Sequence, residues 1–302
     1  MRVGRKTFLL YASLLPFFVL GFYTVKKGID EYVLAYRPRP ELFPRQEFIN
    51  RHGFPADSQE VRIPYQYQGE QSFIAGSLHL SEGRPLVILL HGTGANRQQL
   101  VHEAIALADS GLGFFLMDWP GHGESPGSIS WDDRERKALS EVVHWLREGM
   151  PSPKVAPLAI YAFSMGAWIA ASSLEHLDGV DSLVLAGVPA DAEYGLNRTG
   201  GVLGYWGSFP ARLVSWLWGS RYWEKAPMDE IGRRPHPRLL IVSGKQDEMI
   251  PTSESLRVFQ KASEPRALWI AESAGHGDYL RADPQGFYEH VIGHFMQVDQ
   301  KR

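Results

Sequence analysis

The sequence predicts an α/β fold, in which helices cover both faces of a mostly parallel central sheet. Short apolar runs alternate along the chain with longer stretches whose apolar residues recur every three or four positions. Continuous apolar runs are typical of strands buried on both faces, and the longer spacing is typical of helices packed on a sheet. Hydrophobic residues make up 44% and charged residues 22% of the 302 positions, as in folded globular proteins. We therefore expect one large domain with an appendage.

The strands and helices are predicted in chain order. Two β-rich runs joined by the turn Gln68–Glu70 predict an antiparallel opening pair, and the six apolar runs after them predict buried parallel strands. The predicted strands are Val61–Tyr67, Phe73–Leu80, Leu86–Leu90, Phe114–Met117, Leu158–Ala162, Leu183–Ala186, Leu239–Val242 and Ala267–Ile270. The predicted helices are Gln98–Ser110, Asp132–Gly149, Met165–His176, Ser253–Ala262 and Pro284–Val298.

Two of these helices carry local start signals. Ser130 stands before Trp131 with Asp133 three positions on, which resembles a capping box. Asp283 precedes Pro284, which puts a capping side chain before a proline in the first turn. Both signals agree with the helices predicted from apolar spacing.

The composition excludes several classes of function. The formal net charge is −3 and the basic residues are scattered, so nucleic acid is not expected as a partner. The chain has no cysteine, which excludes disulfides, a cysteine nucleophile and thiolate metal sites. His290 and His294 stand four apart, a spacing that could bind a metal, but no acidic motif accompanies them. We expect no metal and no cofactor, and the sequence leaves the oligomeric state open.

Residues 1–45 predict a membrane anchor followed by a linker. Phe8–Val25 is an uncharged apolar run, close to the minimum length that spans a hydrocarbon layer of about 30 Å. Basic residues precede it, and Lys26 and Lys27 follow it without a small-residue cleavage signal. This favours a retained signal anchor over a cleaved signal peptide, with a buried core helix as a further alternative.

The linker sets the expected domain boundary. Residues 36–44, YRPRPELFP, are too rich in proline to continue a helix. The folded domain is therefore expected at residues 46–302. We expect a membrane protein with a single-pass anchor, a cytoplasmic N-terminus and the folded domain outside the cytoplasm, although basic residues on both sides of the anchor compete in setting this topology.

One segment breaks the alternation of strands and helices. Residues 191–234 contain four tryptophans, several glycines and little strand character, so they predict a small cap inserted into the domain. The indole rings could line a pocket for an acyl group or reach a membrane interface. They could equally pack the cap against the core, and the sequence leaves these alternatives open.

A serine stands at the end of the fifth predicted strand. Residues 158–162 run directly into Phe163-Ser164-Met165-Gly166 and then into a helix. This is the context of a nucleophile elbow, a sharp turn that lifts a serine clear of the sheet edge. Ala162 and Gly166 supply the small residues that such a turn needs, although the first position is more usually glycine. A serine at a helix start can also be a simple N-cap, so the assignment needs support from other groups.

Further groups follow the ends of other predicted strands. The strand Leu86–Leu90 ends in His91-Gly92-Thr93-Gly94, where glycines let the backbone approach a substrate. We assign two oxyanion-hole donors, the backbone N–H groups of Thr93 and Met165. Asp247 and His276 each follow a late strand, which gives the chain order serine, aspartate, histidine.

These motifs together resemble the α/β-hydrolase superfamily. The matching segments HGTG, MDWPGHGES, AFSMG, GKQDEMIP and AGHGD cover the chain from about Leu86 onward. With an N-terminal anchor, the set is similar to the membrane-anchored Bem46-like hydrolases. The resemblance implies the α/β-hydrolase fold and a catalytic triad. In that triad Ser164 attacks a carbonyl, His276 takes and returns the proton, and Asp247 holds the imidazolium.

Other polar residues compete for these roles. Asp118 precedes the nucleophile in the chain, which departs from the expected order, and residues 121–125 predict a tight structural turn. His91 is expected to organise the oxyanion turn through hydrogen bonds. The rival acids are Asp229 and Glu248, whereas Asp278 is expected to be a solvated loop charge.

The sequence therefore predicts a serine hydrolase that acts on a small-molecule or lipid acyl substrate. The expected bond is a carboxylic ester, thioester or lysolipid acyl bond, cleaved through an acyl-enzyme. An amide or peptide hydrolase of the same fold is an alternative, because both reactions share this pathway. A non-catalytic binding protein that keeps the fold is the alternative from a different class.

Overall fold

The computed structural model describes residues 53–128, 130, 133–150, 157–191 and 225–298. The chain divides into Met1–Arg37 and Pro38–Arg302, and all of the described residues belong to the second unit. The predicted anchor and linker, and residues 192–224 of the predicted cap, lie outside the described residues. In the described part, no helix combines the length and the apolar character that crossing a membrane requires.

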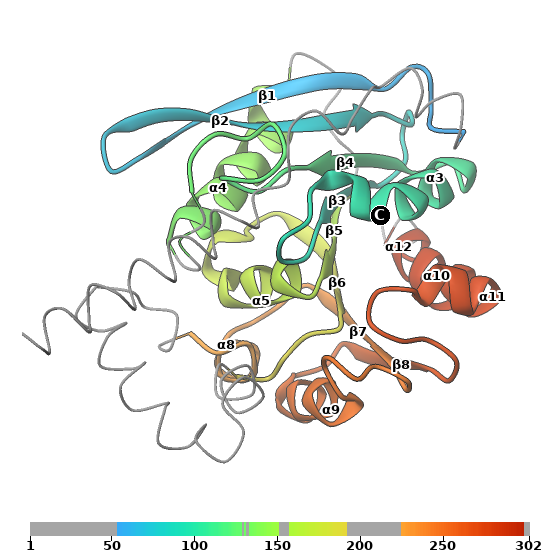
Figure 1. Cartoon of the computed structure of the whole chain (residues 1–302). Helices are drawn as coiled ribbons and strands as arrows, with labels where there is room; N and C mark the ends of the chain where they lie inside the picture. The colour runs from blue at the N-terminus through green and yellow to red at the C-terminus, as the bar shows by residue number, and fades with distance from the viewer. Residues whose placement is uncertain (1–52, 129, 131–132, 151–156, 192–224, 299–302) are drawn as a thin grey trace, which may run out of the picture. The chain divides into compact units, whose positions relative to one another are not determined.

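Eight strands form one sheet in the order β1-β2-β4-β3-β5-β6-β7-β8 (Figure 1). β1 and β2 form an antiparallel hairpin and β2 is antiparallel to β4, whereas all pairs from β4 to β8 are parallel. The strands are β1 Gln59–Tyr67, β2 Glu70–His79, β3 Leu86–Leu90, β4 Gly113–Met117, β5 Leu158–Phe163, β6 Val180–Ala186, β7 Arg238–Gly244 and β8 Arg266–Ala271. The predicted strands, the opening pair and the mostly parallel sheet are confirmed, with small shifts at the strand ends.

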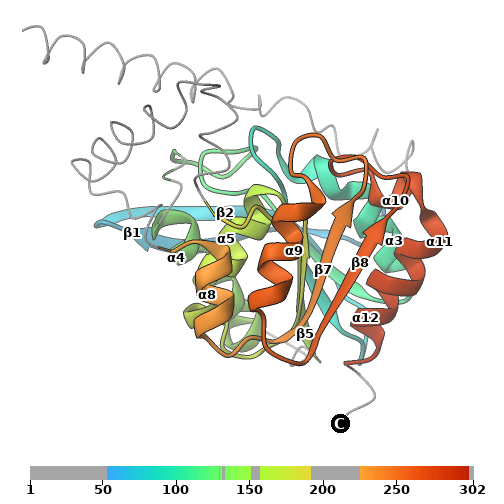
Figure 2. The same ribbon diagram turned by 90° about the horizontal axis from the view of Figure 1, so that it is seen from below.

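Helices cover both faces of the sheet, as predicted (Figure 2). One face carries α4 Asp133–His144 with η3 Trp145–Gly149, α5 Met165–Ser172 with η4 Leu174–His176, α8 Pro227–Arg233 and α9 Thr252–Lys261. The other carries η2 Arg97–Leu100, α3 Val101–Asp109, α10 Tyr279–Ala282, α11 Pro284–Gly286, η6 Phe287–Ile292 and α12 Gly293–Met296. Helix α8 lies at the end of the segment predicted as a cap, and it packs against α5 and α9.

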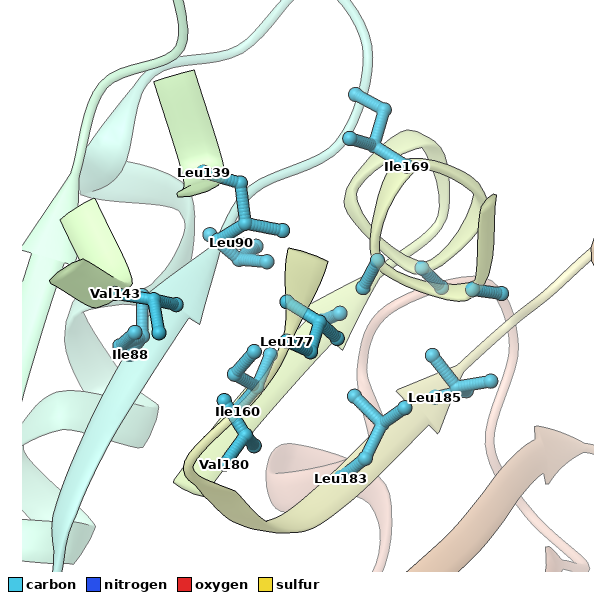
Figure 3. Close-up of a cluster of buried hydrophobic side chains, with 14 of the residues drawn as sticks. Ile88, Leu90, Leu139, Val143, Ile160, Ile169, Leu177, Val180, Leu183 and Leu185 are labelled. Carbon is cyan, nitrogen blue, oxygen red and sulfur yellow. The ribbon is translucent and has the colours of Figure 1, made fainter. Parts of the chain in front are cut away.

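The strands separate two hydrophobic cores. Ile88 and Leu90 of β3 point into the core under α4 and α5, whereas Val87 and Leu89 point into the core under α3 and α12, and all four are fully buried. Figure 3 shows side chains of the first core, which come mainly from the strands and from α4 and α5. Each buried side chain of this size stabilises the fold by about 1.5–3 kcal/mol. Both faces therefore hold the sheet rigidly, and its carboxyl edge is left to carry polar loops.

The helix starts agree only partly with the predicted caps. The N–H and Oγ–H of Ser130 donate to the two carboxylate oxygens of Glu135 at 2.8 and 2.7 Å. The acceptor for Ser130 is therefore Glu135 rather than Asp133. Asp133 instead pairs with Arg136. Asp283 caps α11 as predicted, because its Oδ1 accepts the N–H of Gly286 at 2.9 Å.

Candidate active site

Ser164 stands between the last residue of β5 and the first residue of α5, with φ 53° and ψ −112°. Among the described non-glycine residues, the other positive φ belongs to Gln68 in the hairpin turn. A side chain strains such a conformation, which persists only where its surroundings impose it. The Ser164 N–H donates to the carbonyl of Ala186 in β6 at 2.9 Å, which ties the turn to the neighbouring strand. The backbone therefore has the sharp form expected of the predicted elbow.

The small residues flanking Ser164 have different roles. A β-carbon at Gly166 would lie 2.5 Å from the carbonyl oxygen of Leu90, because α5 begins directly against the end of β3. Glycine is required there. Ala162 is fully buried and pairs in register with Leu90 of β3. Alanine is thus accommodated at the position where glycine is more usual.

Ser164, His276 and Asp247 are joined by hydrogen bonds. His276 Nδ1 lies 2.7 Å from Asp247 Oδ2, and His276 Nε2 lies 3.1 Å from Ser164 Oγ. The other carboxylate oxygen of Asp247 accepts the N–H groups of Met249 and Ile250 at 2.8 and 2.7 Å. An ionised carboxylate only accepts, so Nδ1 carries the hydrogen and Nε2 is the acceptor for the serine hydroxyl. The arrangement can pass the serine proton to the imidazole.

The imidazole of His276 is held by residues that the sequence did not single out. Phe163 packs against it with ring centroids 4.8 Å apart, and the ring of Tyr279 lies edge-on to Phe163 with centroids 6.4 Å apart. Gly187, directly after β6, has φ 59°, and a β-carbon there would lie 3.2 Å from His276 Cε1. The sequence signal that could have identified Gly187 is its position as a glycine directly after an apolar strand, at the carboxyl edge of the sheet.

Asp278 organises the histidine loop, so its prediction as a solvated loop charge is wrong. Its Oδ1 accepts the N–H of Gly275 at 2.6 Å, and its Oδ2 pairs with Arg281 at 3.0 Å. The hydrogen bond closes the turn formed by residues 275–278, and His276 is part of that turn. This limits the positions that the imidazole can adopt.

The two predicted oxyanion donors lie at the ends of adjacent strands. Thr93 is in the loop after β3, Met165 begins α5 after β5, and β3 and β5 pair in the sheet. As the first residue of a helix, Met165 has an N–H without an acceptor inside that helix. Within the described part of the chain, no backbone acceptor is bound to the Thr93 N–H. Neither N–H group therefore has a backbone acceptor among the described residues.

His91 organises the loop after β3 through hydrogen bonds, as predicted. Its ring is fully buried, its Nδ1 lies 2.8 Å from the carbonyl of Gly92, and its Nε2 accepts the N–H of Trp119 at 3.2 Å. Since the Gly92 carbonyl only accepts, Nδ1 carries the hydrogen. Burial lowers the pKa of His91 to about 3, so the ring stays neutral and keeps both bonds.

Asp118 is also structural. One of its oxygens accepts the N–H of Arg97 at 2.8 Å and the other accepts the N–H of Glu124 at 3.0 Å. Burial raises the pKa of the Asp118 carboxyl despite the nearby Arg97 guanidinium. Residues 121–125 form the predicted tight turn, closed by the Gly121 N–H and the Ser125 carbonyl at 3.1 Å.

The remaining candidates are exposed or bound to other residues. Glu248 is exposed, and Asp229 on α8 lies 3.9 Å from Arg233. His294 is buried with its Nε2 3.2 Å from the carbonyl of Arg238, and His290 stacks on Trp269. The described residues contain no cluster of side chains suited to hold a metal ion.

Comparisons with known proteins agree with this architecture. The family model described as serine aminopeptidase, S33, matches residues 81–226. The chain is 26% identical over 201 residues to the uncharacterized protein Rv2307c of Mycobacterium tuberculosis, which covers 66% of each chain. It is 22% identical over 218 residues to the protein bem46 of Schizosaccharomyces pombe, which covers 71% of this chain and 68% of the relative.

A solved structure supplies the comparison of folds. The esterase Pf2001 of Pyrococcus furiosus superposes with a TM-score of 0.63 at 20% identity, over 82% of this chain and 96% of that one. The sheet order, the strained serine turn and the likeness to this esterase show that the chain has the α/β-hydrolase fold. Over residues 81–226 its sequence is similar to the family described as serine aminopeptidase, S33.

Proposed function

We propose that the protein is a serine hydrolase that cleaves a carboxylic ester-type acyl bond through a covalent acyl-enzyme. The observation that carries the proposal is the hydrogen-bonded series Ser164–His276–Asp247 at the carboxyl edge of the sheet. A serine hydroxyl is a weak nucleophile unless a base lies within hydrogen-bonding distance, and His276 meets that need. The superfamily is consistent with hydrolysis, while the substrate depends on the site rather than the fold.

The reaction follows from the positions of the donors and acceptors. As Ser164 Oγ bonds to the substrate carbonyl carbon, its proton moves to His276 Nε2, and Asp247 stabilises the resulting imidazolium. The carbonyl oxygen becomes an oxyanion, which the N–H groups of Thr93 and Met165 would bind. His276 then gives the proton to the leaving alcohol, and water hydrolyses the acyl-enzyme by the same steps in reverse.

Esters, thioesters and lysolipids form the substrate class that we favour. A predicted membrane anchor at residues 1–45 and a Trp-rich segment at 191–234 both suit an acyl-bearing substrate. A second candidate is amide or peptide hydrolysis, which the description of the matching family as a serine aminopeptidase supports.

We also propose that residues 1–45 anchor the protein in a membrane, with the hydrolase domain outside the cytoplasm. Fractionation and protease protection of the full chain test this localisation.

Labelling by a fluorophosphonate probe tests the proposed chemistry. The phosphorus is attacked by an activated serine, fluoride leaves, and a stable serine phosphonate results. We expect labelling of the full chain and none of Ser164→Ala, with Ser125→Ala still labelled, because the Ser125 hydroxyl donates to the buried carbonyl of Asp118. An unlabelled parent chain would instead support a binding protein that keeps the fold.

A further inference from the structure

Both backbone polar groups of Gly92 are bound within the loop after β3. Its N–H donates to Gln99 Oε1 at 2.7 Å, and its carbonyl accepts the Nδ1–H of His91 at 2.8 Å. A β-carbon at Gly92 would lie 3.1 Å from Phe163 Cε1 and 3.2 Å from Gln99 Oε1, so the residue is enclosed by both side chains. The peptide groups on either side of Gly92 are thus held in one orientation.

This orientation decides which N–H faces the site. In a trans peptide the carbonyl and the following N–H point in opposite directions. Because His91 binds the Gly92 carbonyl, the Thr93 N–H points away from the His91 ring. Because Gln99 binds the Gly92 N–H, that group is not available to a substrate. Of these two adjacent residues, Thr93 is therefore the one whose N–H has no backbone acceptor within the described part of the chain.

Gln99 is itself held in place. It lies on η2, where Asn96 caps the turn by accepting the Gln98 N–H at 2.9 Å. The Arg97 N–H donates to Asp118 Oδ1 at 2.8 Å, which ties η2 to the end of β4. Gln99 is an exposed residue, so its contribution comes from the hydrogen bond rather than from core packing.

We infer that Gln99 is a positioning residue for the oxyanion hole, acting through the Gly92 backbone to aim the Thr93 N–H at the substrate oxyanion. This inference rests on the proposed function, because it concerns the same site. Gln99 touches no reacting atom in this role. Removing its acceptor leaves the His91–Gly92 peptide with the bond from Trp119 Nε1 to the His91 carbonyl, at 3.1 Å, so the Gly92 backbone can shift and move the Thr93 N–H with it.

Gln99→Met tests the inference, since methionine keeps the length of the side chain and removes the strong acceptor. The full-length variant is assayed for p-nitrophenyl butanoate hydrolysis and for inhibition by a trifluoromethyl ketone. Ser164 Oγ adds to the carbonyl carbon of the ketone, whose oxygen becomes an oxyanion, while the serine hydroxyl proton moves to His276. We expect kcat to fall about 10-fold with KM unchanged and the inhibition constant to rise by the same factor, less than the loss from deleting a donor. If Gln99 only stabilised the fold, the fall in kcat and the rise in the inhibition constant would not be equal.

Two further variants make the result specific. Gln99→Glu keeps an acceptor oxygen and should retain a higher kcat than Gln99→Met. Gln260→Met, at an exposed glutamine on α9, should match the parent. A kcat of Gln99→Met within twofold of the parent, or equal losses in Gln99→Met and Gln99→Glu, overturns the inference. A parent chain without turnover or fluorophosphonate labelling contradicts the proposed function instead, so the two failures are distinguishable.

Discussion

Replacing Gly187 by alanine tests how closely the fold positions the imidazole of His276. The new β-carbon would lie 2.9 Å from Tyr279 Oη and 3.2 Å from His276 Cε1. Carbon atoms in contact prefer separations of about 3.5–4.0 Å, so the imidazole or the backbone of Gly187 has to move by several tenths of an ångström. A misplacement of about 1 Å can lower a rate about 100-fold, and we expect kcat to fall about 10-fold here.

The backbone adds a separate effect on stability. Gly187 has φ 59°, and a side chain in this region costs about 1–2 kcal/mol. Gly83→Ala is the matched control, because Gly83 has φ 67° and no atom within 4 Å of its built β-carbon. Both variants should lose a few degrees of Tm, about 2–4 °C per kcal/mol in a domain of this size.

The assay combines thermal melts with p-nitrophenyl ester kinetics on both full-length variants. Gly83→Ala should keep the parent kcat, whereas Gly187→Ala should lose activity as well as stability. Equal kcat in the two variants would refute the argument that contact at Gly187 sets the position of His276.

Three further predictions concern stability and metal dependence. Burial raises the pKa of Glu103 from 4.5 to about 7, so the stability it contributes is complete below about pH 4.5 and is lost as the pH rises through about 7. Urea denaturation should therefore find Glu103→Gln more stable than the parent at about pH 8, by up to about 3 kcal/mol, with the difference gone at about pH 4; a constant difference refutes this. Asp118→Ala leaves the N–H groups of Arg97 and Glu124 unbound and should lower the free energy of unfolding by about 3 kcal/mol, whereas an unchanged urea midpoint contradicts the structural role. Dialysis against EDTA should leave esterase turnover unchanged, and a loss restored by a divalent cation would contradict the metal-free mechanism.

The sheet could be predicted from the sequence because burial on both faces leaves a continuous apolar run. Leu86–Leu90 and Leu158–Ala162 are both present as strands, and the polar residues placed after them do lie at one edge. Parallel strands end together, so residues far apart in the chain meet there. This is why Ser164, Asp247 and His276 could be named before their distances were known.

The features that escaped prediction depend on contacts between distant segments. The need for glycine at position 187 comes from Tyr279 and His276, which lie about ninety residues away in the chain. The acceptor for Gly92 is Gln99, and nothing in the local sequence favours that residue over its neighbour Gln98. Asp278 was misinterpreted because a loop carboxylate gives no sign of the backbone N–H that it binds.

One of the two helix-start predictions, the pairing of Ser130 with Asp133, failed for a related reason, whereas Asp283 caps α11 as predicted. Asp133 has the spacing of a capping box, yet Glu135 binds Ser130 and Asp133 pairs with Arg136. Spacing identifies which carboxylates can reach a cap, and competition with nearby cations decides which one does.

Ester hydrolysis by the full chain and by Ser164→Ala tests the central claim most directly. Substrates are p-nitrophenyl esters over a series of acyl lengths, and thermal melts check that both proteins are folded. We predict turnover by the parent, with a preferred acyl length, and loss of turnover in Ser164→Ala at an unchanged fold, since removing one hydroxyl opens no core cavity. Turnover retained by folded Ser164→Ala would contradict the proposed mechanism.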